Sequence, residues 1–409
     1  MSKDAGAPPE KARRNGAATP GLATKGVRAG LARSSHGETS EALYLTSGYV
    51  YDSAEEAAAR FSGDAPGYIY ARYGNPTVAM FEARLAALEG AESCMATASG
   101  MAAMFGALAA HLSAGDHIVA SRYLFGSCHQ VITRILPRFG IGFTLVDAAD
   151  MAAWEAAATP QTKAFFLETP ANPTLDVFDI AAIARVAHEA GALLFVDNVF
   201  ATPVLQNPLA LGADVVIHSA TKHMDGQGRA LGGAVLAGEA FIHDTLRPFV
   251  RNTGPALSPF NAWLMLKGLE TLKLRVEAAS RSARAIAGHL EARLGPGRVR
   301  YPHLTSFPAH DLAKRQMRMG GTLTAFELPG GRRQAFAFLN ALRLIDISNN
   351  LGDAKSLITH PASTTHHAVD AKDRAAQGVS EGLVRLSVGL EDTADLLADL
   401  DQALKQAGA

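Results

Sequence analysis

The sequence predicts an α/β fold, in which a mainly parallel sheet carries helices on both faces and a smaller α+β domain follows. The chain has 409 residues, which is enough for two or three domains. Between residues 117 and 219, short apolar runs typical of strands alternate with helix-like stretches, the pattern of a parallel sheet. Beyond Tyr301 the order of strand-like and helix-like segments changes, and this change indicates the second domain.

The N-terminal part of the chain has little periodicity. Residues 1–35 mix Ala, Gly, Pro, Lys and Arg, and such a segment buries too little apolar surface to offset its ordering entropy, so a disordered tail is expected. Residues 36–77 alternate aromatic residues with small and polar ones, and they are predicted to form an extended arm with one helix at 54–61. Further helices are expected at 80–88 and 101–112.

The strands of the large domain are predicted from five apolar runs, at 117–121, 143–147, 163–168, 192–198 and 214–219. The clearest helix covers 180–192, where apolar residues recur at intervals of three and four and a glycine lies near the end. A long amphipathic stretch, 260–294, is expected to be one interdomain helix, with the domains covering 78–275 and 276–409. The second domain is predicted to contain strands at 321–328 and 383–390 and helices at 332–343 and 392–407.

Composition excludes several classes of partner. Lys and Arg number 38 against 39 Asp and Glu, so the net charge of −1 gives no electrostatic basis for binding nucleic acid or a membrane surface. Cys94 and Cys128 are the two cysteines, and they form neither a disulfide framework nor a zinc spacing, which favours a reducing, cytoplasmic location. No run approaches the 18 or more apolar residues of a membrane span, and the first residues lack the apolar middle of a secretory signal.

The most informative segment is 196–236, which carries an acid and a lysine after successive strands. Asp197 lies at the carboxyl end of one predicted strand, and Lys222 follows the next, and ligands of open α/β sheets bind at such strand ends. A lysine amine beside hydroxyls and glycine backbone can form a Schiff base with an aldehyde, while a carboxylate can keep a pyridine nitrogen protonated. Together these residues predict a pyridoxal phosphate site. Alone, Asp197 could be a helix cap and Lys222 a surface lysine.

With these motifs, the chain from about residue 36 to its end resembles the Cys/Met-metabolism family of pyridoxal-phosphate enzymes. Within the family, 37–61 and 344–361 are most similar to the O-succinylhomoserine sulfhydrylases. The resemblance implies the type I aminotransferase-like fold, with a seven-stranded sheet in a cofactor-binding domain at 78–275 and a substrate-binding domain at 276–409. It also implies that the arm at 36–77 contacts a neighbouring subunit.

The resemblance assigns roles around the cofactor. Lys222 would form the Schiff base and later move the substrate's protons, and Asp197 would pair with the pyridine nitrogen. Contacts to the phosphate would come from two groups, the hydroxyls of Ser219 and Thr221 and the loop of Ser99, Gly100 and Met101. The amino terminus of a helix offers unpaired amides and a positive dipole end to an anion, which suits the second group, although Ser-Gly-Met alone is only a helix start.

Further roles come from other segments. Tyr70 and Arg72 would reach the phosphate of the neighbouring subunit, since an Arg fork suits a phosphate dianion; without the resemblance they read as an exposed turn. Asn172 would lie beside the cofactor's phenolic oxygen. Ser356 and Arg385 would hold the substrate's α-carboxylate, and a charge inside an apolar strand supports a ligand for Arg385, with a structural ion pair as the alternative.

One position departs from the family. Many members have tyrosine where this chain has Phe125, so the ring that stacks on the cofactor is retained but its phenol is lost. Tyr123 is displaced by two positions and is not expected to replace it. The glycines at 226–232 lack dinucleotide-binding spacing, and the histidine pair at 366–367 lacks further ligands, so neither a nicotinamide cofactor nor a metal is expected.

The resemblance predicts a γ-replacement, in which succinate leaves O-succinyl-homoserine and sulfide takes its place to give homocysteine. Cystathionine synthesis with cysteine, sulfhydrylation of O-acetyl-homoserine, and γ-lyase activity are the alternatives. A shared site further implies a dimer, or a homotetramer built as a dimer of dimers. The loss of the Phe125 phenol counts against the lyase alternative more than against replacement.

Overall fold

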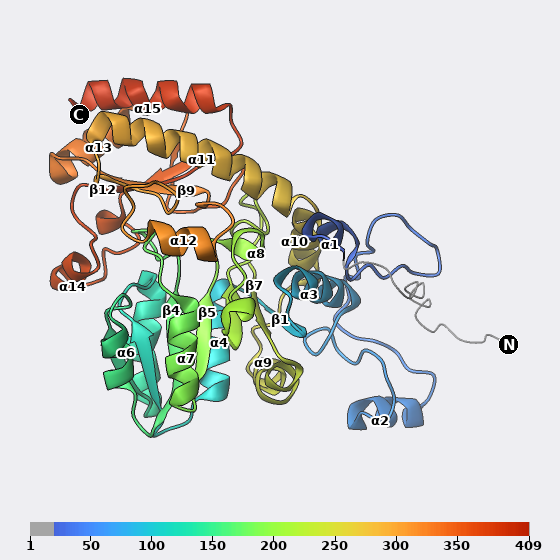
Figure 1. Cartoon of the computed structure of the whole chain (residues 1–409). Helices are drawn as coiled ribbons and strands as arrows, with labels where there is room; N and C mark the ends of the chain where they lie inside the picture. The colour runs from blue at the N-terminus through green and yellow to red at the C-terminus, as the bar shows by residue number, and fades with distance from the viewer. Residues whose placement is uncertain (1–19, 409) are drawn as a thin grey trace.

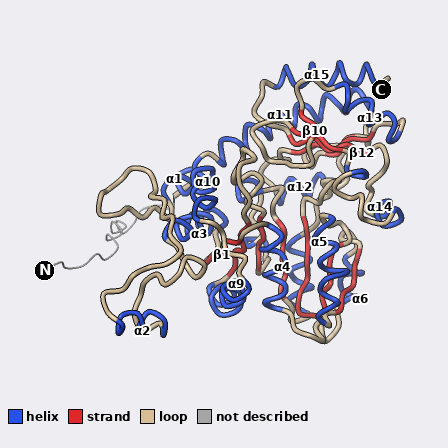
Figure 2. Tube along the Cα trace, turned by 180° about the vertical axis from the view of Figure 1, so that it is seen from behind, coloured by secondary structure: helices blue, strands red, loops and turns tan. Residues whose placement is uncertain are grey.

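The computed structural model describes residues 20–408. Two sheet-containing regions lie one above the other in Figure 1, and the long helix α11 (Leu272–Leu294) runs from one to the other. An N-terminal segment extends to one side, and both views show its helix α2 (Ala54–Ser62) lying apart from the main body (Figures 1 and 2). The chain therefore consists of two packed regions and a projecting arm.

The larger region is built on a seven-stranded sheet with the order β1-β7-β6-β5-β4-β2-β3. Strand β7 is antiparallel to both of its neighbours, and the other pairs are parallel. The strands are β1 (Ser93–Thr97), β2 (His117–Ser121), β3 (Gly142–Val146), β4 (Thr162–Glu168), β5 (Leu193–Asp197), β6 (Val215–His218) and β7 (Gly233–Ala237). The predicted mainly parallel sheet is confirmed.

Helices cover both faces of this sheet because its strands are apolar on both sides. Phe165 packs in one cluster with Ile183 of α7 (Ile180–Glu189), while Phe166 packs in another with Met104 of α4 (Gly100–His111). The remaining helices of this region are α3 (Pro76–Glu89), α5 (Gly126–Gln130), the π-helix Val131–Ile135, the 3-10 helix Leu136–Phe139, α6 (Met151–Ala157), α8 (Thr202–Leu205), the 3-10 helix Leu209–Leu211, the π-helix Phe241–Leu246, α9 (Arg247–Thr253) and α10 (Pro259–Glu270).

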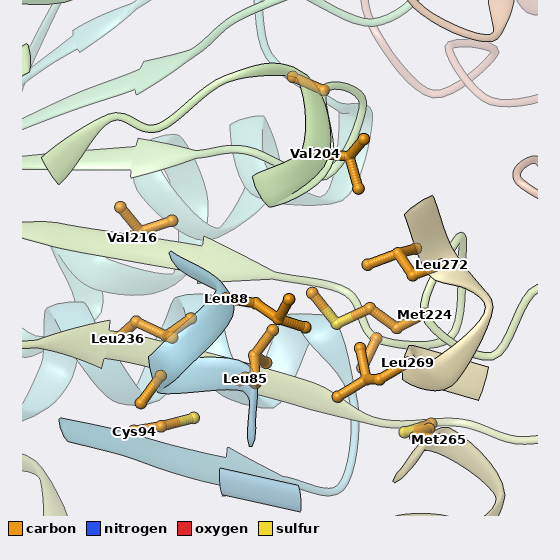
Figure 3. Packing of buried hydrophobic residues seen from close by; sticks show 14 of the residues in the cluster. Leu85, Leu88, Cys94, Val204, Val216, Met224, Leu236, Met265, Leu269 and Leu272 are labelled. Atoms are coloured by element: carbon orange, nitrogen blue, oxygen red, sulfur yellow. The ribbon is translucent and has the colours of Figure 1, made fainter. Parts of the chain in front are cut away.

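The cluster in Figure 3 joins α3 to the sheet and to α10. Leu85 and Leu88 of α3 pack there with Leu236 of β7 and with Leu269 of α10, and the four side chains are at most 5% exposed. At about 25 cal/mol per Å² of apolar surface, each buried leucine contributes roughly 1.5–3 kcal/mol. This packing fixes α10, and with it the start of α11, against the large sheet.

The smaller region contains a five-stranded sheet in the order β10-β11-β12-β9-β8. Its strands are β8 (Val299–Arg300), β9 (Leu323–Glu327), β10 (Asp346–Ile347), β11 (Leu357–Thr359) and β12 (Leu383–Ser387). Its helices are α12 (His310–Gln316), α13 (Gly331–Ala341), the 3-10 helix Pro361–Ser363, α14 (Ala371–Ala376) and α15 (Thr393–Ala407). The predicted strands at 321–328 and 383–390 correspond to β9 and β12, which pair antiparallel at the centre of the sheet.

Two expectations about helices were wrong. Instead of one helix over 260–294, the chain forms α10 and α11, separated at Thr271, whose φ of −108° and ψ of 3° are not helical. Because of this break, α10 packs against the large domain, while Ile286 and Leu290 of α11 pack in the core of the small domain. The predicted boundary at 275/276 therefore falls inside α11.

The other wrong expectation concerns the tail. Residues 22–28 form helix α1, where disorder was expected through residue 35. Leu22 packs against the cluster of Figure 3, and Gly26 lies so close to α10 that a Cβ there would be 3.0 Å from the Leu269 carbonyl oxygen. Residues 1–19 lie outside the described residues.

No helix among residues 20–408 is long and apolar enough to cross a membrane.

Candidate active site

A cavity of about 250 Å³, called here the inner cavity, lies where the carboxyl ends of the parallel strands meet the small domain. It brings together ten of the residues singled out from the sequence, namely Ser99, Gly100, Met101, Phe125, Asn172, Asp197, Ser219, Thr221, Lys222 and Arg385. Their chemical roles stay predictions, but their convergence places a lysine, a carboxylate, hydroxyls and an arginine around one space.

Lys222 follows β6 and is largely buried. Its Nζ donates a hydrogen bond to Asn350 Oδ1 at 2.5 Å. Burial, together with the positive charge of Arg385, lowers the pKa of the Lys222 amine to about 8. A larger fraction of this amine is therefore neutral near neutral pH than for an exposed lysine, and only the neutral form can attack an aldehyde.

Asp197 ends β5, and its Oδ1 accepts a hydrogen bond from Val199 N at 3.0 Å. Glu168 ends the neighbouring strand β4, directly across the register from Asp197. Burial raises the pKa of Asp197 to about 6, and it raises the pKa of Glu168 well above its ordinary value, with the Asp197 charge adding to the effect. A cationic ring nitrogen against Asp197 would relieve this burial of negative charge.

Glu168 is the main residue that the sequence interpretation left without a role. Its two carboxylate oxygens accept hydrogen bonds from Phe125 N at 2.7 Å and from Asn172 N at 2.8 Å. It thereby joins the segment that carries the stacking ring to the segment that carries Asn172. Its place at the end of a predicted strand, the feature that identified Asp197, was the available signal.

A cradle for an anion lies at the start of α4. Ser99 caps this helix by accepting a hydrogen bond from Ala102 N at 3.1 Å. A Cβ on Gly100 would lie 2.5 Å from the Ser219 Cβ, so only glycine allows this approach of the helix to the loop after β6. The first amides of a helix have no helical partners, and a phosphate fits there beside the Ser219 hydroxyl.

Thr221 lies on the same side of the cavity. Its hydroxyl donates to the Gly232 carbonyl at 3.2 Å and accepts from Gly232 N at 3.0 Å, which ties the lysine loop to the strand β7 that follows. This exchange holds Lys222, one residue later, in a defined position.

Arg385 lies in the centre of β12, and it is 1% exposed. It donates to Asn172 Oδ1 at 2.8 Å and to the Asn349 carbonyl at 2.9 Å, while its Nε has no partner. Within residues 20–408 no carboxylate forms an ion pair with it, so the alternative of a structural ion pair does not hold. A buried guanidinium without an acid is costly unless an anion is bound, as an α-carboxylate would be.

Three predicted residues lie elsewhere. Ser356 does not line the cavity, because its hydroxyl donates to Glu391 at 2.8 Å and accepts from Gly389 N at 2.9 Å. Arg72 donates to the Arg251 carbonyl, and Tyr70 is 43% exposed. Neither Tyr70 nor Arg72 enters the inner cavity of its own chain.

The remaining residues clarify the departure at Phe125. Tyr123 does not line the inner cavity, and its hydroxyl donates to Asp147 at 3.1 Å. Asn350, Thr365 and the buried Cys128 are further residues at or beside the inner cavity that received no role from the sequence. Asn350 falls within the segment 344–361 that carried the resemblance, but only the fold brings it to Lys222.

The doubly wound fold, the buried lysine after β6, the carboxylate at the end of the neighbouring strand β5 and the anion cradle are together typical of a pyridoxal-phosphate enzyme. A family model described as Cys/Met metabolism PLP-dependent enzyme matches residues 23–405. The chain therefore belongs to this family of pyridoxal phosphate (PLP)-dependent enzymes, and the predicted resemblance is confirmed.

Individual relatives are similar over nearly their whole length. An O-succinylhomoserine sulfhydrylase of Mycobacterium tuberculosis is 55% identical over 93% of this chain and 95% of the relative, and one of Pseudomonas aeruginosa is 52% identical over 93% and 94%. An L-methionine gamma-lyase of Treponema denticola is 42% identical over 94% and 96%. A solved structure from Campylobacter jejuni that contains N′-pyridoxyl-lysine-5′-monophosphate has a TM-score of 0.89 and 33% identity, covering 94% of this chain and 99% of that one.

Proposed function

We propose that this chain is an O-succinylhomoserine sulfhydrylase, which replaces the succinate of O-succinyl-homoserine by sulfide and so forms homocysteine for methionine synthesis. The identity of 55% and 52% to two such sulfhydrylases, against 42% to the lyase, supports this activity. The observation that carries the chemistry is the buried, acid-free Arg385 beside Lys222, because it can hold an amino acid by its carboxylate with the α-carbon near the amine.

The residues of the inner cavity fit PLP. Lys222 Nζ would attach it, Asp197 would pair with its ring nitrogen, and Ser99, Ser219 and Thr221 surround the place for its phosphate. When bound, the cofactor supplies an electron sink for the negative charge that develops at the substrate's α-carbon. The contribution of the protein is to orient the substrate and to move protons.

In the proposed reaction, Arg385 binds the α-carboxylate and fixes the amino acid. The freed Lys222 amine removes a proton from the α-carbon, and it must release this proton, which the cofactor's electron sink would take up, before it removes a second proton from the β-carbon. The bond between the γ-carbon and the ester oxygen breaks and succinate departs with its electron pair. Hydrogen sulfide then adds through sulfur at the γ-carbon and gives up one proton, and Lys222 returns one proton to the β-carbon and one to the α-carbon in turn, so that homocysteine, succinate and one proton are the products. Lys222 is the one amine among the side chains that line the inner cavity.

Phe125 is relevant to this assignment of proton transfer. It carries no ionisable group, and the nearby phenol of Tyr123 is engaged with Asp147. Burial and the Asp147 charge raise the pKa of Tyr123 to about 12, so it does not serve as a base near neutral pH. The proton transfers are therefore assigned to Lys222.

Product analysis tests the proposed function. The purified protein receives O-succinyl-homoserine with equal concentrations of sulfide and cysteine, and a second sample receives the ester alone. Mass spectrometry is expected to find homocysteine as the main product. Cystathionine as the main product, or a keto acid in the sample without thiols, would overturn the sulfhydrylase assignment in favour of a synthase or a lyase.

The assembly is proposed to be a homotetramer of two dimers, in which each arm supplies Tyr70 and Arg72 to the partner's site. The projecting arm supports this assembly. Neither Tyr70 nor Arg72 lines the inner cavity of its own chain, which supports it as well. We predict that Arg72→Ala and Lys222→Ala are each inactive, and that dimers re-formed from an equal mixture recover about one quarter of wild-type activity. Failure to recover activity, with mixed dimers shown by native mass spectrometry, would contradict the shared site.

A cytoplasmic location is proposed as well. Both cysteines are buried and free, as is typical of proteins of reducing compartments.

A further inference from the structure

A second cavity, called here the junction cavity, lies between the two regions of the molecule and shares no lining residue with the inner cavity. Its volume is about 270 Å³. The large region contributes Arg122, His129 and Leu145 to its walls, and the small region contributes residues of α14 and Gln377, which follows this helix. Both views show α14 at the level where the two regions meet (Figures 1 and 2).

The fold leaves polar groups unsatisfied around the junction cavity. Three of its residues have a side-chain atom that is shielded from solvent and has no hydrogen-bond partner within residues 20–408, namely Arg122 Nε, His129 Nδ1 and Gln377 Oε1. His129 is 8% exposed and Gln377 is 3% exposed. Native proteins pair nearly all of their buried polar groups, so three unpaired groups around one space indicate a polar ligand.

The walls contributed by the large region are held by backbone hydrogen bonds. Arg122 directly follows β2, and its N donates to the Val146 carbonyl of β3 at 2.9 Å. His129 lies on α5, and its N donates to the Phe125 carbonyl at 3.0 Å. Both side chains are therefore placed by regular secondary structure, and the cavity has a defined shape before a ligand enters.

The charges of the junction cavity favour an anion. Arg122 and Lys372 line it, and neither forms an ion pair within residues 20–408. Among the described residues, Asp373 is the one acid in the lining. Burial lowers the pKa of His129, so its imidazole is neutral near neutral pH and offers hydrogen bonds rather than charge. Two cations against one carboxylate leave the lining with a net positive charge.

The arrangement of the two cations indicates a ligand with two charged ends. Arg122 belongs to the large region and Lys372 to α14, while Leu145 and Ala376 add apolar surface to the same lining. A short chain with a carboxylate at each end matches this set of groups, and the fork of an arginine binds a carboxylate through two hydrogen bonds. The volume lies just below the roughly 300–1,000 Å³ of sites for drug-sized ligands, which suits a molecule of a few carbon atoms.

We propose that the junction cavity binds a short-chain dicarboxylate, which joins α14 to the large region. The inference goes beyond the proposed function and does not depend on it. The site adjoins two segments that also form the inner cavity, because α5 begins directly after Phe125 and the chain reaches α14 soon after Thr365. These segments are in close contact, since a Cβ on Gly126 would lie 2.7 Å from the Thr365 carbonyl oxygen.

Calorimetric titration of the holoenzyme with succinate tests the class of ligand. Succinate has two carboxylates joined by two methylene groups, whereas acetate has one carboxylate and inorganic phosphate has charge without a chain. We expect succinate to bind at least about 10-fold more tightly than acetate or phosphate, because it alone pairs with both cations and covers the apolar wall. Equal affinity for phosphate or acetate would overturn the assignment to a dicarboxylate.

Variants test the place of binding. Lys372→Met removes an exposed cation from the lining, and Lys405→Met removes an exposed cation of α15 outside it. Lys372→Met should weaken succinate binding by about 10-fold, and Arg122→Met should weaken it further, whereas Lys405→Met should leave it unchanged. Arg385→Met should also leave it unchanged, because Arg385 lines the inner cavity instead. Loss of binding in Arg385→Met alone would place succinate in the inner cavity and overturn the proposal.

Hydrogen exchange locates the ligand independently of these affinities. Succinate should slow amide exchange in α5 and α14 of the wild-type holoenzyme by about 2-fold or more, and it should have no such effect in Lys372→Met at the same concentration. Protection that is absent from both helices, or that persists in Lys372→Met, would contradict the junction site. Both experiments measure binding, so their results are independent of the reaction that the enzyme catalyses.

Discussion

Two buried arginines of this chain differ in the partners that the fold gives them. Arg84 on α3 is completely buried and pairs with the carboxylate of Glu41, and it also donates to the carbonyls of Ala29 and Leu266. Arg385 on β12 is equally buried but has no carboxylate partner and an unpartnered Nε. The first arginine is satisfied by the fold, whereas the second is proposed to be completed by an anionic ligand.

The surroundings of the two residues reinforce the contrast. Glu41 also accepts a hydrogen bond from Lys267 on α10 at 2.9 Å, so the Arg84 site joins the N-terminal segment, α3 and α10. Arg385 instead binds neutral oxygens of Asn172 and Asn349. An unmet charge in a buried site costs stability, and proteins retain such charges where function needs them. The comparison predicts opposite effects of mutation at the two sites.

The largest effect on activity is expected at Arg385. Arg385→Met removes the charge that we propose binds the α-carboxylate, and kcat/KM should fall by about 100- to 1,000-fold. When both lack cofactor, the variant should lose only about 1–3 kcal/mol of stability relative to the wild type, because Asn172 Oδ1 and the Asn349 carbonyl lose their donor but no ion pair is broken. Steady-state kinetics measures the fall in kcat/KM, and calorimetry measures the thermal stability. A loss of stability as large as that expected for the Arg84 variant would remove the contrast between the two arginines.

The largest effect on stability is expected at Arg84. Arg84→Met leaves Glu41 buried with a single cationic partner, Lys267, and the free energy of unfolding should fall by about 3–5 kcal/mol. Chemical denaturation measures this loss. The kcat per folded molecule should remain close to that of the wild type, because Arg84 does not line the inner cavity, and a large fall in kcat would contradict this purely structural role.

A smaller, pH-dependent effect is expected at Lys222. Its pKa is lowered in the folded state to about 8, so the buried charge opposes folding at pH below 8. As pH rises from 8 towards 10.5, the folded state loses this proton before the unfolded state does, and stability increases. Cofactor-free Lys222→Met should therefore be more stable than the wild type at pH 7, by roughly 1–3 kcal/mol, with a gap that narrows above pH 8. Denaturant titrations at several pH values measure the difference in stability between the variant and the wild type. A difference that stays constant with pH would contradict the buried charge of Lys222 as its cause.

The smallest effect on activity is expected at Ser356. Its hydroxyl bonds to Glu391 and Gly389, outside the inner cavity. Ser356→Ala should cost about 1–3 kcal/mol of stability, because the buried partners lose a hydrogen bond, while KM for the ester changes less than about 2-fold. A large rise in KM would instead support the role that the family resemblance gave this residue.

The inner cavity also shows why some site residues were predicted and others were not. Asp197 and Lys222 were identified because each follows a buried strand, and the ends of parallel strands meet at one edge. Glu168 carried the same signal, its place at the end of a predicted strand, but its role in joining the Phe125 and Asn172 segments depends on contacts that only the fold creates. Asn350 comes from a segment whose meeting with the site depends on packing between elements far apart in the chain.

Strand prediction was similarly uneven. The parallel strands were predicted to within two residues, because they are short apolar runs flanked by helices. The run at Gly233–Ala237 is small and glycine-flanked, and β1 precedes the first predicted alternation, so neither was assigned. Their pairing with each other, and with β6, completes the seven-stranded sheet.

The sequence by itself determined the α/β class, the lysine and carboxylate pair, and the glycine at the start of α4. These features follow from local periodicity and from residue types whose chemistry is specific, and they need no knowledge of distant contacts. The tertiary structure decided that Arg385 has no ion-pair partner among residues 20–408, that Ser356 lies outside the lining of the inner cavity, and that Asn350 meets Lys222. Such properties depend on which side chains are brought together from distant parts of the chain, because burial and the presence or absence of a partner exist only after folding.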